Sequence, residues 1–102
     1  MKLGVEALAA QLPMLDGWAH VADRGGMLSR EFRFEDFVQA FGFMAQMALH
    51  AERMNHHPEW FNVYNRLSVT LTTHDVGGIS AKDIEMACLM NRTFAARAAA
   101  QA

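Results

Sequence analysis

The stretch from Arg66 to His74 alternates between apolar and polar side chains along most of its length. Successive side chains of a strand point to opposite faces of the sheet, so an alternating stretch buries one face. The apolar set is Leu67, Val69 and Leu71, and the polar set is Ser68, Thr70, Thr72 and His74. This pattern predicts a strand with His74 at its end, in a sheet that another layer covers on one side only.

Three further segments predict the rest of that sheet. Residues 60–63 also alternate, and Tyr64-Asn65 between the two arms predicts a tight turn because Asn accepts a positive φ. Earlier in the chain, the short run 17–21 and the alternating run 28–34 flank the turn-forming sequence Asp23-Arg24-Gly25-Gly26. The sequence therefore predicts two antiparallel hairpins.

Three segments follow the helical period instead. Residues 2–12 form a short amphipathic pattern that ends at Pro13. A longer pattern begins after the acidic pair Glu35-Asp36 and ends near Asn55, and its apolar stripe is Phe37, Val38, Phe41, Met44, Ala45, Ala48 and Leu49. The last helix is expected to begin at Ser80, with Asp83 completing its cap, and to continue through the alanine-rich tail 95–102.

These elements run in the order helix, two strands, helix, two strands, helix. The order predicts an α+β fold in which three helices pack on one face of a four-stranded antiparallel sheet. At 102 residues the chain is long enough for one core, so we expect a single domain over residues 1–102.

Composition narrows the classes of partner and compartment. The formal net charge is −2 and the nine basic residues are scattered, which argues against direct binding to nucleic acid. No apolar run is long enough to cross a membrane or to form a signal sequence. The single cysteine, Cys88, cannot form an internal disulfide and lies in a helical apolar pattern, so we expect a reducing, cytoplasmic setting.

Three of the five histidines lie at two predicted element ends. His56 and His57 follow the long helix, between Asn55, which tolerates the left-handed conformation, and Pro58, which stops the helix. His74 ends the alternating strand. Because the unperturbed pKa of histidine is about 6.5, rings gathered from these two ends would suit acid and base chemistry near neutral pH.

Two other roles for these histidines remain open. A zinc site could combine them with Glu52 or Asp75, although adjacent histidines usually point apart and the chain has no His-Glu-x-x-His spacing. A histidine near a helix C-terminus can also serve only the helix dipole and the last carbonyl groups.

The neighbouring residues have competing structural roles. Glu52 lies one turn before His56 and either orients that ring or is solvated. Asp83 has a sufficient role as a helix cap. We expect Phe61 in the core and Trp60 on the polar face, as a wall for a flat ligand or an oligomer contact. Two histidines lie outside this group, namely His20 and His50. We expect them at the surface or in positions where their ring nitrogens are hydrogen-bonded.

One set of residues forms a pattern of characteristic spacings that extends through most of the chain. It comprises Glu52, His56-His57-Pro58, Tyr64, His74 and Asp83, together with the block His-His-Pro-Glu-Trp-Phe-Asn-Val-Tyr-Asn at 56–65 and the earlier blocks 12–18, 32–37 and 41–44. In these residues the chain resembles the pterin-4a-carbinolamine dehydratases, a family also known as dimerisation cofactors of a homeodomain transcription factor. The residues after Asn91 are less distinctive.

The resemblance implies that the chain dehydrates 4a-hydroxytetrahydropterin to quinonoid dihydropterin. The pterin would be the substrate, with no metal and no cofactor, and the reaction would serve aromatic amino acid hydroxylases. His56 and His74 would form the acid and base pair, and His57 would bind the pterin. Further residues implied at the site are Asn55, Thr72, Thr73, Asp75 and Trp60 as substrate contacts, and Glu52, Pro58 and Asp83 as supports.

The resemblance also implies self-association as a homodimer or a homotetramer. The second hypothesis for the function is a binding module, a regulatory partner of a transcription factor or a hydroxylase, because a small sheet with exposed edge strands can pair with another subunit.

Overall fold

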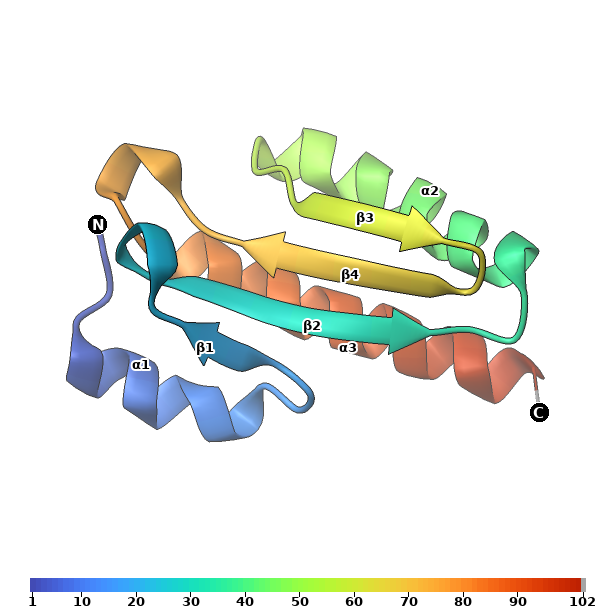
Figure 1. Ribbon diagram of the computed structural model, residues 1–102, viewed down its shortest axis with the longest axis horizontal. Coiled ribbons are helices and arrows are strands. Elements are labelled where there is room, and N and C mark those ends of the chain that lie inside the picture. The colour runs from blue at the N-terminus through green and yellow to red at the C-terminus, as the bar shows by residue number, and fades with distance from the viewer. Residues whose placement is uncertain (102) are drawn as a thin grey trace.

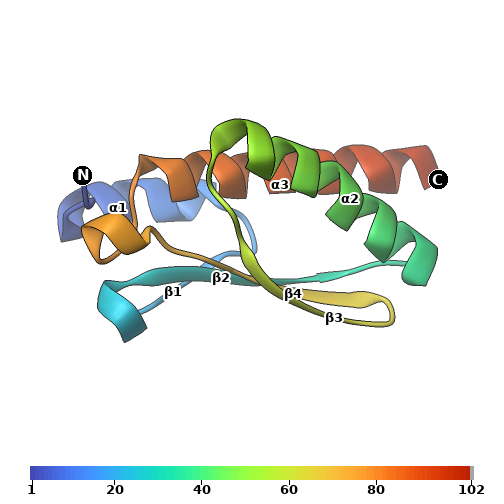
Figure 2. The same cartoon turned by 90° about the horizontal axis from the view of Figure 1, so that it is seen from above.

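The structure is a computed structural model that describes residues 1–101 of the chain. Its regular elements are a four-stranded antiparallel sheet and three helices (Figure 1). The helices lie on one face of the sheet, so the molecule has two layers (Figure 2). The elements are α1 (Val5–Gln11), β1 (Ala19–Val21), β2 (Met27–Arg33), α2 (Phe37–Met54), β3 (Glu59–Val63), β4 (Arg66–Leu71) and α3 (Ala81–Gln101). The predicted fold class and element order are confirmed.

Short 3-10 turns connect some of these elements, at Leu12–Met14, Asp23–Gly25 and His74–Val76. Pro13 therefore lies inside a turn that continues from α1 rather than at a sharp stop. The alanine-rich tail continues α3 to Gln101, and Ala102, also predicted as helical, lies outside the described residues. No helix within residues 1–101 is both long enough and apolar enough to cross a membrane.

The strand order is β1-β2-β4-β3, which places the two longest strands at the centre. Along β2 and β4 the buried residues face one another in register, with Leu28 opposite Leu71 and Phe32 opposite Leu67. The predicted alternation of β4 is confirmed, since its three apolar residues, Leu67, Val69 and Leu71, are all buried.

The end of β4 differs from the prediction. The strand ends at Leu71, three residues before His74. Thr73 leaves the ladder with β2 and instead pairs with Gly78, whose carbonyl oxygen accepts a 2.8 Å hydrogen bond from the Thr73 N–H. His74 consequently begins a 3-10 turn instead of ending a strand.

The two faces of β3 are the reverse of those predicted. Trp60 pairs with Val69 and packs against the core, whereas Phe61 pairs with Ser68 and is 69% exposed. Both residues are large aromatics, so the residue type does not indicate which of them faces the core. A shift of one residue in the register exchanges the two faces of a strand. The turn after β3 also differs, because the positive φ of 53° falls on Tyr64 rather than on Asn65.

Aromatic side chains from both layers meet at the centre of the core. The ring centroid of Phe32 on β2 lies 5.1 Å from those of Phe43 on α2 and Phe94 on α3. Burying each such side chain stabilises the fold by about 1.5–3 kcal/mol. Around them, α2 contributes a buried row consisting of Ala40, Phe43, Met47 and Ala51.

The apolar stripe that identified α2 in the sequence does not form this buried row. Phe37, Val38, Phe41 and Leu49 are between 48% and 70% exposed, and the rings of Phe37 and Phe41 lie 6.0 Å apart on the surface. Helix α2 is thus apolar on two faces, one against the sheet and one toward solvent. A second apolar face on a helix commonly marks an interaction surface.

Candidate active site

Helix α2 ends in a left-handed residue that separates the two adjacent histidines. Asn55 has φ 51° and ψ 44°, as its position predicts, and the His56 N–H donates a 3.1 Å hydrogen bond to the carbonyl oxygen of Ala51. This reversal places His56 in the interior at 8% exposure, while the side chain of His57 remains 54% exposed. The two rings therefore have different surroundings.

His56 is paired with a fully buried carboxylate. Its Nε2 lies 2.6 Å from Oδ1 of Asp83, and Asp83 is 0% exposed. When Asp83 is ionised, its carboxylate can only accept hydrogen bonds, and the Nε2–H of His56 is then the donor. The other oxygen, Oδ2, accepts hydrogen bonds from the Thr73 hydroxyl at 2.7 Å and from the Ser80 N–H at 2.9 Å. Asp83 is thus fully hydrogen-bonded, which offsets the cost of burying its charge.

Asp83 combines the predicted role with a second one. Its bond to the Ser80 N–H, and the 3.3 Å bond from the Lys82 N–H to the Ser80 hydroxyl, form the predicted cap of α3. The same carboxylate also orients His56, a role that the sequence offered to Glu52. Glu52 contacts the other ring instead, with Oε1 lying 2.5 Å from Nε2 of His57. That pair is open to solvent, so its energetic contribution is small.

The end of β4 meets the end of α2 at Asp83. Thr73, the residue before His74, donates to the same carboxylate that accepts from His56. The 3-10 turn that begins at His74 closes with a 3.0 Å bond from the Gly77 N–H to the His74 carbonyl oxygen. The structure thus joins the two predicted element ends, with His56 inside and His74 exposed at the surface.

An ion pair that the sequence analysis missed lies beside His74. The guanidinium of Arg24, in the turn before β2, donates to both carboxylate oxygens of Glu59 at 2.7 and 3.0 Å. These hydrogen bonds hold the pKa of Glu59 below its ordinary value, and the nearby His74 acts in the same direction. The pair also raises the pKa of Arg24. Only the strand order brings these residues together, because they are 35 positions apart in sequence.

The remaining predicted contacts lie on either side of Thr73. A small cavity of about 50 Å³ is lined by Arg24, Thr72, His74 and the neighbouring glycines. A larger one of about 400 Å³ is lined by Asp75, Ser80 and Lys82 among others, and both cavities include Thr73. His57 and Trp60 line neither cavity. Among residues 1–101, no cluster of three His, Cys, Asp or Glu side chains is placed to hold a metal ion.

The profile of a protein family described as pterin 4 alpha carbinolamine dehydratase matches residues 1–93. A curated relative from Sinorhizobium fredii is 49% identical over 94% of this chain and 90% of its own length. Another, from Novosphingobium aromaticivorans, is 58% identical over 83% of this chain and 84% of its own length. Both relatives carry the name pterin-4-alpha-carbinolamine dehydratase provisionally.

Solved structures show the same relationship. A Brucella melitensis protein described as a transcriptional coactivator/pterin dehydratase superposes with a TM-score of 0.87 at 49% identity, over 91% of this chain and 98% of that one. A pterin dehydratase-like protein, described as a RuBisCO assembly factor in the alpha-carboxysome, shares the fold at 18% identity, with a TM-score of 0.66 over 76% of this chain and 89% of that one. The chain therefore belongs to the pterin 4 alpha carbinolamine dehydratase family.

Proposed function

We propose that this protein catalyses the dehydration of 4a-hydroxytetrahydropterin to quinonoid dihydropterin and water. The C4a–O bond breaks, the C4a=N5 double bond forms, and N5 loses its proton. The leaving hydroxyl needs an acid and N5 needs a base. Groups whose pKa lies near the working pH perform both proton transfers most efficiently. In this proposal the pterin is the substrate and histidines move the protons, with no metal and no cofactor.

The proposed acid and base are His56 and His74. Because Nε2 of His56 is held by Asp83, Nδ1 is the nitrogen that would exchange a proton with the substrate. His74 would exchange the second proton from the turn after β4. His57, at the exposed helix exit, would bind and orient the pterin.

Polar groups near the two element ends would hold the pterin ring, each hydrogen bond contributing about 0.5–1.5 kcal/mol. They are Asn55, Thr72, Thr73 and Asp75. Trp60 would have to contact the substrate from the core side of β3, since that is where its ring lies. Glu52 would support His57, and Pro58 would set the direction in which the chain leaves α2.

The observation that carries this proposal is the buried pair of His56 and Asp83, connected through Thr73 to the turn of His74. A buried carboxylate that orients a histidine is a recurrent arrangement in proton-transfer sites, because it fixes the tautomer and the direction of the ring. The family relationship supplies the substrate class, which the geometry alone does not identify.

The test is the rate at which freshly generated 4a-hydroxytetrahydropterin loses water, measured in the presence of a chelator. We expect the protein to accelerate this step and the variants His56→Ala and His74→Ala to lower turnover by about 100-fold or more. His50→Ala, a histidine of α2 outside the site, serves as the matched control and should retain full activity. Rates near wild type in both site variants, or loss of activity on chelation alone, would count against the proposal.

A second candidate function is that of an interaction module, alone or together with catalysis. The exposed face of α2 (Phe37, Val38, Phe41 and Leu49) favours it, as does the edge strand β3, where Phe61 and Val63 are exposed. We propose that these surfaces serve self-association as a homodimer or homotetramer. The related Brucella protein is described as a transcriptional coactivator, and a similar regulatory role, or a link to an aromatic amino acid hydroxylase, is compatible with such surfaces.

A pure adaptor would not accelerate the dehydration, so the assay above separates the two candidates. We also propose a cytoplasmic location, because a single cysteine, Cys88, is compatible with a reducing compartment.

A further inference from the structure

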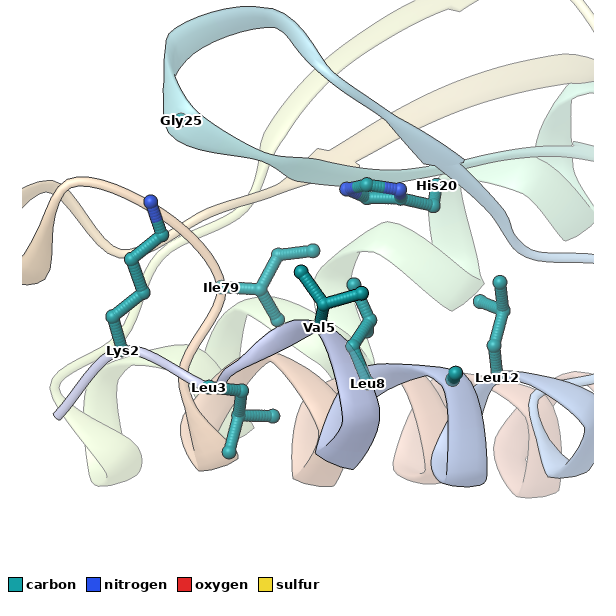
Figure 3. Close-up of a pocket in the computed structure, with 9 residues that line it drawn as sticks. Lys2, Leu3, Val5, Leu8, Leu12, His20, Gly25 and Ile79 are labelled. Atoms are coloured by element: carbon teal, nitrogen blue, oxygen red, sulfur yellow. The ribbon is translucent and has the colours of Figure 1, made fainter.

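A separate apolar slot lies between α1 and the turn that joins β1 to β2. Its volume is about 280 Å³, and its lining is largely aliphatic (Figure 3). Helix α1 contributes Val5, Leu8 and Ala9, the 3-10 turn after it contributes Leu12, and the flanking segments contribute Leu3 and Ile79. None of the lining residues is a predicted residue of the histidine site, and only Leu3 also lines the cavity of about 400 Å³ beside Thr73. The slot is therefore distinct from the proposed catalytic centre.

A flat ring covers one side of this slot. The imidazole of His20 lies over the gap, with the aliphatic side chains of Val5, Leu8 and Ile79 opposite it (Figure 3). Aliphatic carbons on one side and an aromatic face on the other suit a planar, apolar group, since rings stack on rings. A cavity of about 150 Å³ already accepts benzene, so this slot has room for a ring and a short chain.

A cation, the Lys2 ammonium, lies at one end of the slot, next to a hydrogen-bonded stretch of backbone. The Leu3 N–H donates a 2.8 Å hydrogen bond to the Ile79 carbonyl oxygen, which fixes the chain next to Lys2. The Lys2 side chain then passes over Gly78, where a Cβ would lie only 2.6 Å from its Cε. The Nζ atom lies close to Gly25, where a Cβ would be at an ordinary contact distance of 3.5 Å from it. The missing side chain of Gly78 therefore leaves the space through which Lys2 reaches the slot.

The charge at this end is uncompensated. Within residues 1–101 Lys2 forms neither an ion pair nor a side-chain hydrogen bond, and no Asp or Glu lines the slot. A largely apolar cavity with a small number of polar groups, here Lys2 and His20, is the usual form of a small-molecule site. The free ammonium selects an anion, and the flat apolar interior selects an aromatic body.

We propose that the slot binds a small aryl carboxylate. Its ring would lie between His20 and the aliphatic side chains of α1, and its carboxylate would pair with the Lys2 ammonium. The proposal concerns a second site and does not depend on the dehydratase activity.

The test is a titration followed by the backbone amide signals of the ¹⁵N-labelled protein. The probe is 3-phenylpropanoate, and its neutral analogue 3-phenylpropan-1-ol is the control ligand. We expect saturable shifts centred on Val5, His20 and Ile79, with the alcohol binding about fivefold more weakly, as the loss of an exposed ion pair implies. Lys2→Gln should bring the two dissociation constants together.

A second variant tests the location. Ala9→Trp places a large side chain in the slot from an exposed position of α1, and it should abolish the shifts while thermal unfolding shows a folded protein. Shifts centred elsewhere, equal binding of acid and alcohol to the wild type, or tighter binding of the aliphatic hexanoate would each overturn the proposal.

Discussion

Asp83 lies directly against His56 in the interior of the protein, with 2.6 Å between Oδ1 and Nε2 and with side-chain exposures of 0% and 8%. The contact joins the first turn of α3 to the chain that leaves α2. It also ties the packing of two helices to the orientation of one imidazole. Stability and catalysis should therefore change together when this carboxylate changes.

Asp83→Asn tests that coupling. The amide keeps the shape of the side chain but removes the charge and at least one of three accepted hydrogen bonds, leaving a buried donor unsatisfied. We expect the free energy of unfolding to fall by about 1–3 kcal/mol and turnover to fall by about 10- to 100-fold. Chemical denaturation and the dehydration assay measure the two effects. Glu52→Gln at the exposed carboxylate is the control, and a larger loss there than at Asp83 would contradict the assignment.

The ion pair of Arg24 and Glu59 predicts a dependence of stability on pH. Because Arg24 depresses the pKa of Glu59 from its ordinary value of 4.5, the folded state binds this proton less readily than the unfolded state does. The stabilisation is therefore present above pH 4.5 and is lost as the pH falls through the depressed value. Glu59→Gln should have a lower melting temperature than wild type at pH 7, and the difference should shrink toward pH 3. A difference that is constant with pH would contradict the pairing.

The exposed face of α2 predicts a change in oligomeric state. A charge at Phe41, which is 58% exposed on that face, would be costly to bury against a second copy of the chain. Phe41→Asp should raise the dissociation constant of the oligomer at least about tenfold, measured by sedimentation velocity over a range of concentrations. Met14→Asp, at a methionine that is 77% exposed outside α2, should leave association unchanged. Equal effects of the two substitutions would rule out this face.

Two glycine substitutions should differ sharply in their cost. Gly25 has φ 80°, and a Cβ there would overlap the carbonyl oxygen of Gly77, so Gly25→Ala forces two backbone segments apart. We expect a loss of more than about 2 kcal/mol. At Gly42 a Cβ would meet only the end of the Arg97 side chain, which can move, and alanine favours the helix by about 0.5–1 kcal/mol. Gly42→Ala should therefore change stability by less than about 1 kcal/mol in the same denaturation experiment.

Local patterns in the sequence were enough to predict several features of the fold. The alternation of β4, the left-handed Asn55 and the cap formed by Ser80 and Asp83 each depend on residues that are close together in the chain. The physical causes, which are strand pleat, αL tolerance and capping, act over a few residues. They could therefore be inferred without knowing how the elements pack.

Features that depend on packing could not be inferred in this way. Helix α2 has apolar residues on two faces, and its period alone does not indicate which face meets the sheet. Which of Trp60 and Phe61 faces the core depends on the pairing of β3 with β4, which the sequence of β3 does not indicate. The partner of His56 is 27 residues away, whereas the local pattern offered only Glu52, one turn before His56, as an orienting group or a solvated residue. In each case the deciding contact comes from another element.

The left-handed Asn55 gives two chemically identical neighbours unequal access to reagents. The side chain of His57 is exposed to solvent beside Glu52, whereas His56 is buried and hydrogen-bonded to Asp83. A reagent that acylates imidazole should consequently label His57 within the time that free histidine requires, and should label His56 only as often as the helix exit opens. The ratio of the two labelling rates would report how frequently the C-terminal turn of α2 comes apart in the folded protein.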